Sequence, residues 1–364
     1  MITLLTDAHI PWLDQILPET SVRILRYKPD TELRNQIAEA DALFTRTVTK
    51  INPQTFPSFP EKLRVIGSAT AGTDHIDANW LAQNNIRFFH SPGCNARAVA
   101  EYVITVIIHA FEGDINKLKK QKTGIIGFGN TGSQLARILD RLEMPYIAFD
   151  PPKGALDPSF ISASWEETLD CDILSLHVPF TSSGKWPTQH ILSAKSLSDS
   201  SFRLIVNAAR GGVANEADLV AMKQLGKLDF LALDVWKNEP DLNYDILHAA
   251  DIATPHIAGY SQQAKYEASR IACSSIADAL GFELNPAEPA YEIAPAISAS
   301  EGLYLALQNH HPLFQLDGLL RNKPDAFSTL RNTFPLRNEF RKTTLTNCLS
   351  KDTLLIDALE FNRL

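Results

Sequence analysis

The stretch Lys122-Thr-Gly-Ile-Ile-Gly-Phe-Gly-Asn-Thr-Gly132 decides the fold of this chain. It begins as a short apolar strand, passes through a glycine-containing turn, and continues as a helical pattern that leads to a second strand ending at Asp150. This pattern is typical of a βαβ unit that binds a dinucleotide. In such a unit Gly127 permits the tight turn, Gly129 lets the backbone approach a pyrophosphate, and Gly132 lets the helix pack closely on the strand.

The same unit predicts which dinucleotide is bound. The first turn of the helix contains Asn130, Thr131 and Gly132, and its free N–H groups and dipole would point at the diphosphate. Asp150 would accept hydrogen bonds from the adenosine ribose and repel a 2′-phosphate, so we expect NAD rather than NADP. Lys153 is the one nearby cation that could weaken this preference, and we expect it to be a solvated loop residue.

Length and composition limit the class of protein. A chain of 364 residues exceeds the usual single core, so we expect two or three domains. Its net charge of −8 argues against a nucleic-acid or membrane partner, and an anionic substrate would need a local cluster of donors. We see no signal peptide and no membrane-spanning run. The four cysteines lack metal-binding spacing, which favours a reduced cytoplasmic protein with no metal.

The first ninety residues alternate short apolar runs with helical patterns, which favours a parallel α/β sheet. Five runs are expected to be strands: residues 2–6, 22–27, 42–45, 63–67 and 86–89. This half has no dinucleotide fingerprint, so we expect it to bind the substrate. Two polar loops follow its third and fourth strands, where ligands bind in such sheets. The second is rich in hydroxyl-bearing and small residues, so its backbone N–H groups could form an anion-binding nest.

The rest of the chain suggests three domains. A long apolar helix at residues 95–111 would lead into the cofactor-binding half, and four later strands each end at a polar loop. A helix from about 260 to 281 would return the chain to the first half. We therefore expect a substrate-binding domain at residues 1–93, completed by about 262–285, an NAD-binding domain at 94–261, and a C-terminal dimerisation domain at 286–364.

The expected fold class is α/β. It would comprise two Rossmann-like or flavodoxin-like parallel-sheet domains with a cleft between them, and a small C-terminal α+β domain. The C-terminal segment is too short to form a large core alone, so we expect association with a second subunit to stabilise it.

Three polar residues follow strands of the NAD-binding half and suit hydride transfer from a 2-hydroxy acid. Arg210 supplies a planar fork that matches a carboxylate. His256 is the candidate base. Glu239 would accept a hydrogen bond from the second imidazole nitrogen, which fixes the tautomer and favours the charged ring. Each residue alone could equally be an ordinary turn or loop residue.

Their surrounding motifs resemble those of the D-isomer-specific 2-hydroxyacid dehydrogenase family. The cofactor fingerprint is followed, in that family's order and spacing, by Asn207-Ala-Ala-Arg-Gly-Gly212, Asp234-Val-Trp236 with Glu239-Pro240, and Thr254-Pro-His-Ile-Ala-Gly259. The resemblance covers residues 1–285. It implies that Arg210, Glu239 and His256 are catalytic and that His256 donates or accepts the proton.

The resemblance also implies further contacts to NAD. Asp150, Asp234 and Gly259 would contact the cofactor, Asp234 through the nicotinamide amide. His177 and Val178 would lie beside it. Because Val178 stands where a threonine is common, we expect its contact to be through the main chain.

Within that family the resemblance narrows to members that oxidise a phosphorylated hydroxy acid. It implies that Thr47, Thr70 and Tyr260 contact the substrate. The phosphate would need its own anion site, which could be built from the following groups: Arg46, Thr47, Lys50 and the backbone of Thr70, Ala71 and Gly72. A homodimer formed through the C-terminal domain is also expected.

Two alternatives remain open. The chain could be another dehydrogenase of this family, of the 3-phosphoglycerate or hydroxypyruvate/glyoxylate type. It could also be a non-catalytic NAD(H)-sensing protein, which would be expected to lack the Arg, Glu and His set, whereas all three residues are present here.

Overall fold

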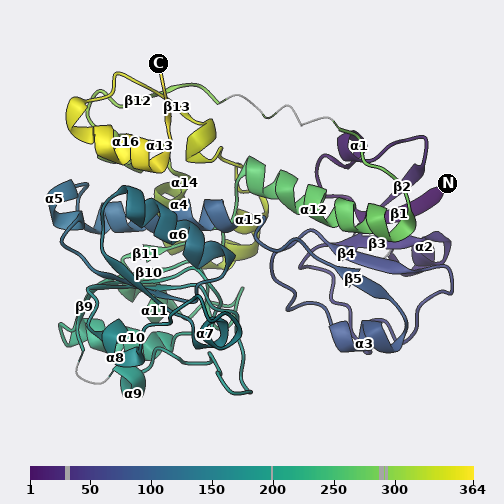
Figure 1. The fold of residues 1–364 in the computed structure, drawn as a ribbon, viewed down its shortest axis with the longest axis horizontal. Helices are drawn as coiled ribbons and strands as arrows, with labels where there is room; N and C mark the ends of the chain where they lie inside the picture. The colour runs from purple at the N-terminus through teal and green to yellow at the C-terminus, as the bar shows by residue number, and fades with distance from the viewer. Residues whose placement is uncertain (29–32, 198–199, 287–290, 292–293) are drawn as a thin grey trace. The chain divides into compact units, whose positions relative to one another are not determined.

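The computed structural model describes residues 1–28, 33–197, 200–286, 291 and 294–364. These residues form two compact units (Figure 1). Unit 1 comprises Met1–Asn95 and Gln262–Glu292, and unit 2 comprises Ala96–Ser261 and Ile293–Leu364. The proline-containing segment 285–289, where we expected the last domain to begin, lies mostly outside the described residues. Within the described ranges, no helix is both long and apolar enough to cross a membrane.

Unit 1 contains a five-stranded parallel sheet with the strand order β2-β1-β3-β4-β5. Its strands are β1 (Ile2–Asp7), β2 (Val22–Tyr27), β3 (Ala42–Thr45), β4 (Val65–Ser68) and β5 (Arg87–Phe89). All five lie close to the predicted bounds. The helices are α1 (Leu13–Ile16), α2 (Leu33–Gln36), α3 (Ala78–Gln83) and α12 (Gln262–Leu280), with a 3-10 turn, η1 (Ile37–Glu39).

Both faces of this sheet are buried because neighbouring strand residues point to opposite sides. Leu4 packs in one apolar cluster with Ile276 of α12. Its neighbour Leu5 packs in another cluster with Leu81 of α3. The same alternation holds in β3 and β4. Helix α12 therefore packs on the sheet of unit 1.

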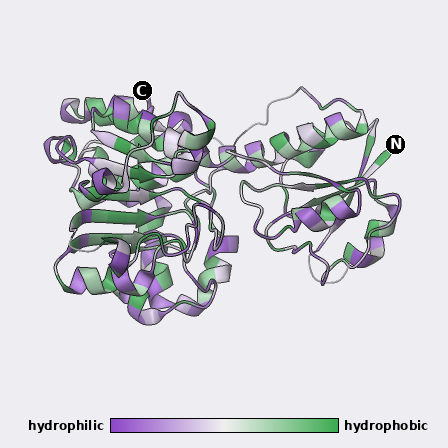
Figure 2. Cartoon of the chain, turned by 60° about the horizontal axis from the view of Figure 1, so that its bottom comes forward, coloured by the Kyte–Doolittle hydropathy of each residue, from purple (hydrophilic) through white to green (hydrophobic). Residues whose placement is uncertain are grey.

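Unit 2 contains a six-stranded parallel sheet with the order β11-β10-β9-β8-β6-β7. Its strands, drawn largely in the hydrophobic colour in Figure 2, are β6 (Thr123–Ile126), β7 (Tyr146–Phe149), β8 (Ile173–Leu176), β9 (Phe202–Asn207), β10 (Leu228–Leu233) and β11 (Ile252–Ala253). The chain reverses its direction of travel across the sheet between β6 and β8. Open α/β sheets bind ligands at such a switch point, beyond the carboxyl ends of the strands.

Helices flank this sheet. They are α4 (Ala96–Ala110), α5 (Ile115–Leu118), α6 (Asn130–Arg141), α7 (Pro151–Leu156), α8 (Trp165–Leu169), α9 (Ala194–Leu197), α10 (Glu216–Gln224) and α11 (Tyr244–Ala249).

Residues 294–364 belong to unit 2 and add four helices and a small parallel sheet. The helices are α13 (Leu303–His310), α14 (Pro312–Asn322), α15 (Phe327–Asn332) and α16 (Thr353–Leu359), with 3-10 turns η2 (Pro324–Ala326), η3 (Phe340–Lys342) and η4 (Ser350–Asp352). The strands are β12 (Ile297–Ser298), β13 (Thr344–Thr346) and β14 (Asn362–Arg363). Strands this short show no readable alternation, which is why the expected α+β class came without any located strand here.

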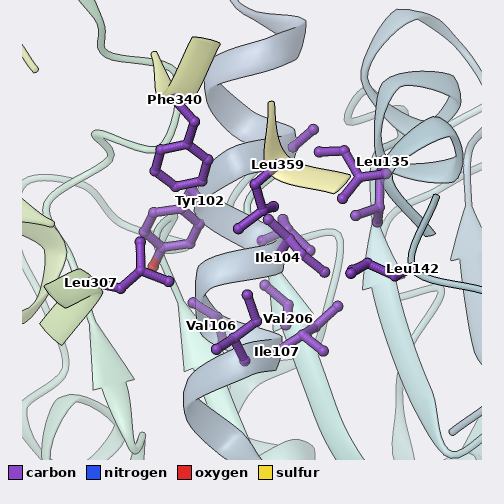
Figure 3. Close-up of a cluster of buried hydrophobic side chains, with 14 of the residues drawn as sticks. Tyr102, Ile104, Val106, Ile107, Leu135, Leu142, Val206, Leu307, Phe340 and Leu359 are labelled. Atoms are coloured by element: carbon purple, nitrogen blue, oxygen red, sulfur yellow. The ribbon is translucent and has the colours of Figure 1, made fainter. Parts of the chain in front are cut away.

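Helix α4 lies at the centre of the largest apolar cluster of unit 2. Figure 3 shows Leu135 of α6 on one side of α4 and the C-terminal residues Leu307 and Phe340 on the other. Residues from the part that we expect to bind NAD and from the C-terminal segment thus share one core. The C-terminal segment therefore packs into a core that its own chain forms. This core does not require the second subunit that we expected from the small size of the segment.

A buried ionic cluster reinforces this contact. Glu101 of α4 is fully buried and pairs with Arg97 at 2.7 Å and with Arg337 at 2.6 Å. It also accepts a hydrogen bond from the backbone N–H of Phe340 at 3.0 Å. Arg337 donates a second bond to the carbonyl oxygen of Ala98 at 3.1 Å. A buried carboxylate needs such partners, because an unpaired buried charge is strongly destabilising.

Candidate active site

The glycine turn after β6 has the geometry that a dinucleotide requires. Gly127 has a φ of 95°, a conformation that glycine adopts without strain. A Cβ atom on Gly132 would lie 2.1 Å from the carbonyl oxygen of Gly127, so α6 packs directly on the turn. A Cβ atom on Gly129 would have nothing within 4 Å. The turn is therefore tight and closely packed but open at its middle glycine.

Asp150 connects the end of β7 to this turn. Its carboxylate accepts hydrogen bonds from the backbone N–H of Phe128 at 2.7 Å and of Lys153 at 3.0 Å. Lys153 lies in α7 and is not the solvated loop residue we expected. Its ammonium donates to the carbonyl oxygen of Phe128 at 3.1 Å and lies over the rings of Phe128 and Phe160, 4.8 and 4.6 Å from their centroids.

His177 and Val178 follow β8, on the other side of the turn. The Nε2 atom of His177 lies 2.9 Å from the hydroxyl of Ser175, and among the residues that the structure describes its Nδ1 atom has no hydrogen-bond partner. Burial lowers the pKa of His177 to about 4, so the ring is neutral at physiological pH. Val178 packs over the turn, with its side chain 2.8 Å from where a Cβ on Gly127 would be.

Arg210, Glu239 and His256 follow three adjacent strands, β9, β10 and β11. The loop of Arg210 is fixed by Asn207, whose side chain accepts from the N–H of Ala209 and donates to the carbonyl oxygen of Arg210, each at 3.1 Å. The guanidinium of Arg210 donates to the carbonyl oxygen of Ala209 at 2.8 Å. A buried strand end thus presents this cation at the carboxyl edge of the sheet.

His256 and Glu239 form the hydrogen-bonded pair that the sequence predicted. The Nδ1 atom of His256 lies 2.7 Å from one carboxylate oxygen of Glu239. The other oxygen accepts from the backbone N–H of Trp236 at 2.8 Å. Burial would raise the pKa of Glu239, but the bonds from His256 and Trp236 and the charge of His256 outweigh it, so that this pKa is lowered. An ionised Glu239 makes Nδ1 the donor and leaves Nε2 for proton transfer.

Asp234 holds the loop of His256, a role that we did not derive from the sequence. Its buried carboxylate accepts from the backbone N–H groups of Ile257 at 2.8 Å and Ala258 at 2.9 Å, and from the hydroxyl of Thr254 at 2.6 Å. Tyr102 of α4 lies 2.8 Å from the same hydroxyl. Tyr102 and Thr254 were not predicted, because no local pattern indicates that residues 152 positions apart meet here.

Gly259 and Tyr260 end this loop. Gly259 is partly exposed. The ring of Tyr260 packs edge-on against Phe334, with centroids 5.8 Å apart. The expected substrate contact of Tyr260 would therefore start from a ring that is supported by the C-terminal segment.

The predicted phosphate-binding residues lie after β3 and β4 of unit 1. Arg46 is neither free nor fully solvated, since its Nε atom lies 3.0 Å from a carboxylate oxygen of the fully buried Asp7 and its Nη2 atom 3.1 Å from the other. The hydroxyl of Thr70 donates to the carbonyl oxygen of Gly72 at 2.7 Å. Thr47 is exposed.

The remaining predicted groups of this unit are Lys50, which is exposed, and Ala71, whose carbonyl oxygen lies 3.0 Å from Nδ1 of His90. No cluster of three or more His, Cys, Asp or Glu side chains that could hold a metal ion occurs in the described parts of either unit.

Comparisons with known proteins identify the family of this chain. Residues 99–258 match the model of the D-isomer specific 2-hydroxyacid dehydrogenase, NAD binding domain. An erythronate-4-phosphate dehydrogenase of Marinobacter nauticus is 33% identical over 359 residues, which cover 92% of each chain. The chain belongs to the D-isomer-specific 2-hydroxyacid dehydrogenase family. It is therefore an oxidoreductase with an NAD-binding domain.

Other proteins are similar to this dehydrogenase. An erythronate-4-phosphate dehydrogenase of Tolumonas auensis is 32% identical and covers 97% of each chain. Among solved structures, the TT0316 protein from Thermus thermophilus has a TM-score of 0.64 at 24% identity and covers 78% of this dehydrogenase and 98% of its own chain. A D-lactate dehydrogenase from Aquifex aeolicus, complexed with NAD and lactic acid, has a TM-score of 0.59 at 22% identity over 77% and 96%. These structures share the fold.

Proposed function

We propose that this dehydrogenase oxidises 4-phospho-D-erythronate at C2 to 2-oxo-3-hydroxy-4-phosphobutanoate, with NAD as hydride acceptor. This reaction is a step in the biosynthesis of pyridoxal 5′-phosphate, vitamin B6. The main support is the 2.7 Å pair of His256 and Glu239, on loops adjacent to that of Arg210, in a chain whose relatives bear the name of this enzyme.

The residues present fit NAD. The space beside Gly129 is open, and no side chain caps the first turn of α6, whose N–H groups suit a diphosphate. The diphosphate would be held by Gly127, Gly129, Asn130, Thr131 and Gly132. Asp150 would bind the adenosine ribose, and the nicotinamide end would lie near His177, Val178, Asp234 and Gly259. NAD, when bound, supplies the carbon that accepts the hydride.

The proposed chemistry assigns one task to each catalytic residue. Arg210 binds the substrate carboxylate and polarises the adjacent oxygen. Nε2 of His256 takes the proton of the C2 hydroxyl while the hydrogen on C2 leaves with its electron pair for NAD. Glu239 stabilises the imidazolium that results. The products are a 2-oxo acid, NADH and one proton.

The phosphate of the substrate would bind to the loops of unit 1. Asp7 engages the Nε and Nη2 edge of Arg46, so Nη1 is the group that would meet the phosphate. Thr47, Thr70, Ala71 and Gly72 would complete this site, and Tyr260 would contact the substrate elsewhere. Lys50 would add positive charge.

A direct assay tests this function. Purified protein is mixed with NAD and 4-phospho-D-erythronate, with hydrazine to trap the 2-oxo acid, and NADH is followed by its absorbance. We expect kcat/KM to exceed that for 3-phosphoglycerate and glycerate by on the order of 100-fold, since a built phosphate site rejects acids that do not fill it. A larger value for 3-phosphoglycerate or glycerate would favour the alternative dehydrogenases. NADH binding without turnover of any acid would favour a sensing protein.

We also propose that the enzyme is a cytoplasmic homodimer formed through residues 286–364. All four cysteines are free, which suits a reducing compartment. Light scattering should give twice the chain mass of 40.3 kDa. A monomer at micromolar concentration would reject the dimer, and periplasmic or secreted protein in cell fractionation would reject the location.

A further inference from the structure

Glu216 is a buried carboxyl group that the proposed reaction does not use. It is the first residue of α10 and is 7% exposed. One of its oxygens accepts a hydrogen bond from the backbone N–H of Lys237 at 2.7 Å. Lys237 lies in the loop after β10, between Trp236 and Glu239. A side chain that follows the loop of Arg210 therefore holds the backbone of the loop that carries Glu239.

The two loops also touch directly through their backbones. A Cβ atom on Gly211, the residue after Arg210, would lie 1.9 Å from the carbonyl oxygen of Trp236. The N–H of Trp236 donates to Glu239, and the next N–H along the chain, that of Lys237, donates to Glu216. Two consecutive N–H groups thus fix one catalytic carboxylate and one carboxyl group that has no part in the chemistry.

We propose that Glu216 is a positioning residue, which holds the loop of Glu239 against the loop of Arg210 and so keeps the His256–Glu239 pair in position. The proposal rests on the proposed function, because only that function gives the three residues a joint task. A displacement of about 1 Å in such a group is enough to lower a rate on the order of 100-fold.

The protonation state of Glu216 provides a way to test this role. The charged groups that act on it are Lys237 and Glu239. Burial raises the pKa of Glu216 to about 7, against the lowering effect of the Lys237 N–H bond. Below pH 7 the neutral acid accepts the bond through its carbonyl oxygen, and a glutamine would do the same. Glu216→Gln therefore keeps the bond and removes the titration.

The test compares three variants by turnover. Glu216→Ala removes the acceptor and is expected to lower kcat on the order of 10- to 100-fold. Glu216→Gln should keep kcat at pH 6 within about twofold and should lack the inflection near pH 7 that we expect from Glu216 in the wild-type kcat profile. Asp218→Ala is the matched control, since Asp218 lies on the same helix and accepts from the N–H of Ala194 instead, at 2.7 Å.

A second readout is independent of turnover. The Nδ1 proton of His256 should give a downfield proton resonance because it binds a carboxylate. In cofactor-free protein this resonance should weaken or disappear in Glu216→Ala and persist in Glu216→Gln and Asp218→Ala. A resonance retained in Glu216→Ala, or kcat equal to that of Asp218→Ala, would overturn the inference.

If Glu216→Ala does not fold, the comparison of Glu216→Gln with the wild type tests the proposal. An unchanged inflection near pH 7, or a large loss of kcat at pH 6, would then overturn the proposal. Failure of the wild type to turn over any hydroxy acid would instead reject the proposed function, and the resonance would still report on Glu216.

Discussion

At the scale of single residues, His256 has a left-handed backbone conformation, with a φ of 57°. Few residues other than glycine adopt this conformation, and those that do are often held in place at functional sites. Here Asp234 supplies the restraint, since it accepts the N–H groups of the next two residues, Ile257 and Ala258. The backbone of the loop, together with the side chain of Glu239, thus sets the direction of the imidazole.

His256→Ala should lower kcat by on the order of 10²- to 10⁴-fold, because the general base is lost while the NAD-binding turn is unaffected. The dissociation constant for NAD, measured by calorimetry, should stay within about twofold of wild type, as for a residue without a cofactor contact. His248→Ala, an exposed histidine on α11, is the control. Equal turnover in His256→Ala and His248→Ala would remove the proton-transfer role.

Glu216 should also make stability depend on pH. Its pKa is raised from 4.5 to about 7 in the folded protein, so the folded state holds this proton more tightly than the unfolded chain. The wild type should therefore lose on the order of 3 kcal/mol relative to Glu216→Gln as pH rises from about 4.5 to about 7, and nothing further above pH 7. Urea unfolding of both proteins at pH 5, 6, 7 and 8 measures the difference, and a constant difference would contradict the expectation.

Some of the site could be predicted from the sequence. The pairing of His256 with Glu239 was predicted because both residues follow strands of one sheet within recognisable motifs. The support from Asp234, Tyr102 and Glu216 was not, because hydrogen bonds between distant segments leave no local pattern. Lys153 was misjudged for the same reason, since its aromatic neighbour Phe160 becomes adjacent only after folding.

At the scale of elements, two glycine substitutions in the turn and α6 should have different effects, one on stability and the other on NAD binding. Gly132→Ala would place a methyl group 2.1 Å from the carbonyl oxygen of Gly127 and should push α6 off the turn, lowering the melting temperature. Gly129→Ala meets nothing within 4 Å and should leave the melting temperature nearly unchanged, while the methyl group blocks the approach of a pyrophosphate.

Thermal unfolding and NAD calorimetry separate these two outcomes. NAD affinity of Gly129→Ala should fall by at least about tenfold, equivalent to 1.4 kcal/mol. Wild-type affinity in a stable Gly129→Ala protein would show that the cofactor does not lie against this glycine. Equal melting temperatures for Gly132→Ala and wild type would contradict the packing argument.

The prediction of elements succeeded where the pattern was long enough to read. The five strands of unit 1 were recognisable because buried apolar runs alternate there with helical periods. In the C-terminal segment the strands have two or three residues, and their partners are up to 48 positions away, as for Ile297 and Leu345. Pairing of this kind depends on tertiary contacts and not on local periodicity.

At the scale of the whole molecule, unit 2 depends on its C-terminal segment. Arg337→Ala would leave the buried carboxylate of Glu101 with one cation fewer and should lower the free energy of unfolding of unit 2 by about 3–5 kcal/mol. Arg363→Ala is the control, because Arg363 pairs with Asp357 at the surface. Calorimetric scans of both variants provide the measurement. Equal unfolding transitions for the two variants would show that Arg337 contributes little to stability.

The ionic cluster around Glu101 also constrains how this chain can change over evolutionary time. A deletion of residues 294–364 would remove Arg337 and the N–H of Phe340 from Glu101 and would leave Arg97 as its cation. It would also uncover the apolar face of α4 that packs on the C-terminal residues. A lineage that lost this segment would therefore need prior substitutions on α4, both at Glu101 and on the apolar face that the segment covers. The order in which such mutations can occur is thereby restricted, and the C-terminal segment is difficult to lose once it is present.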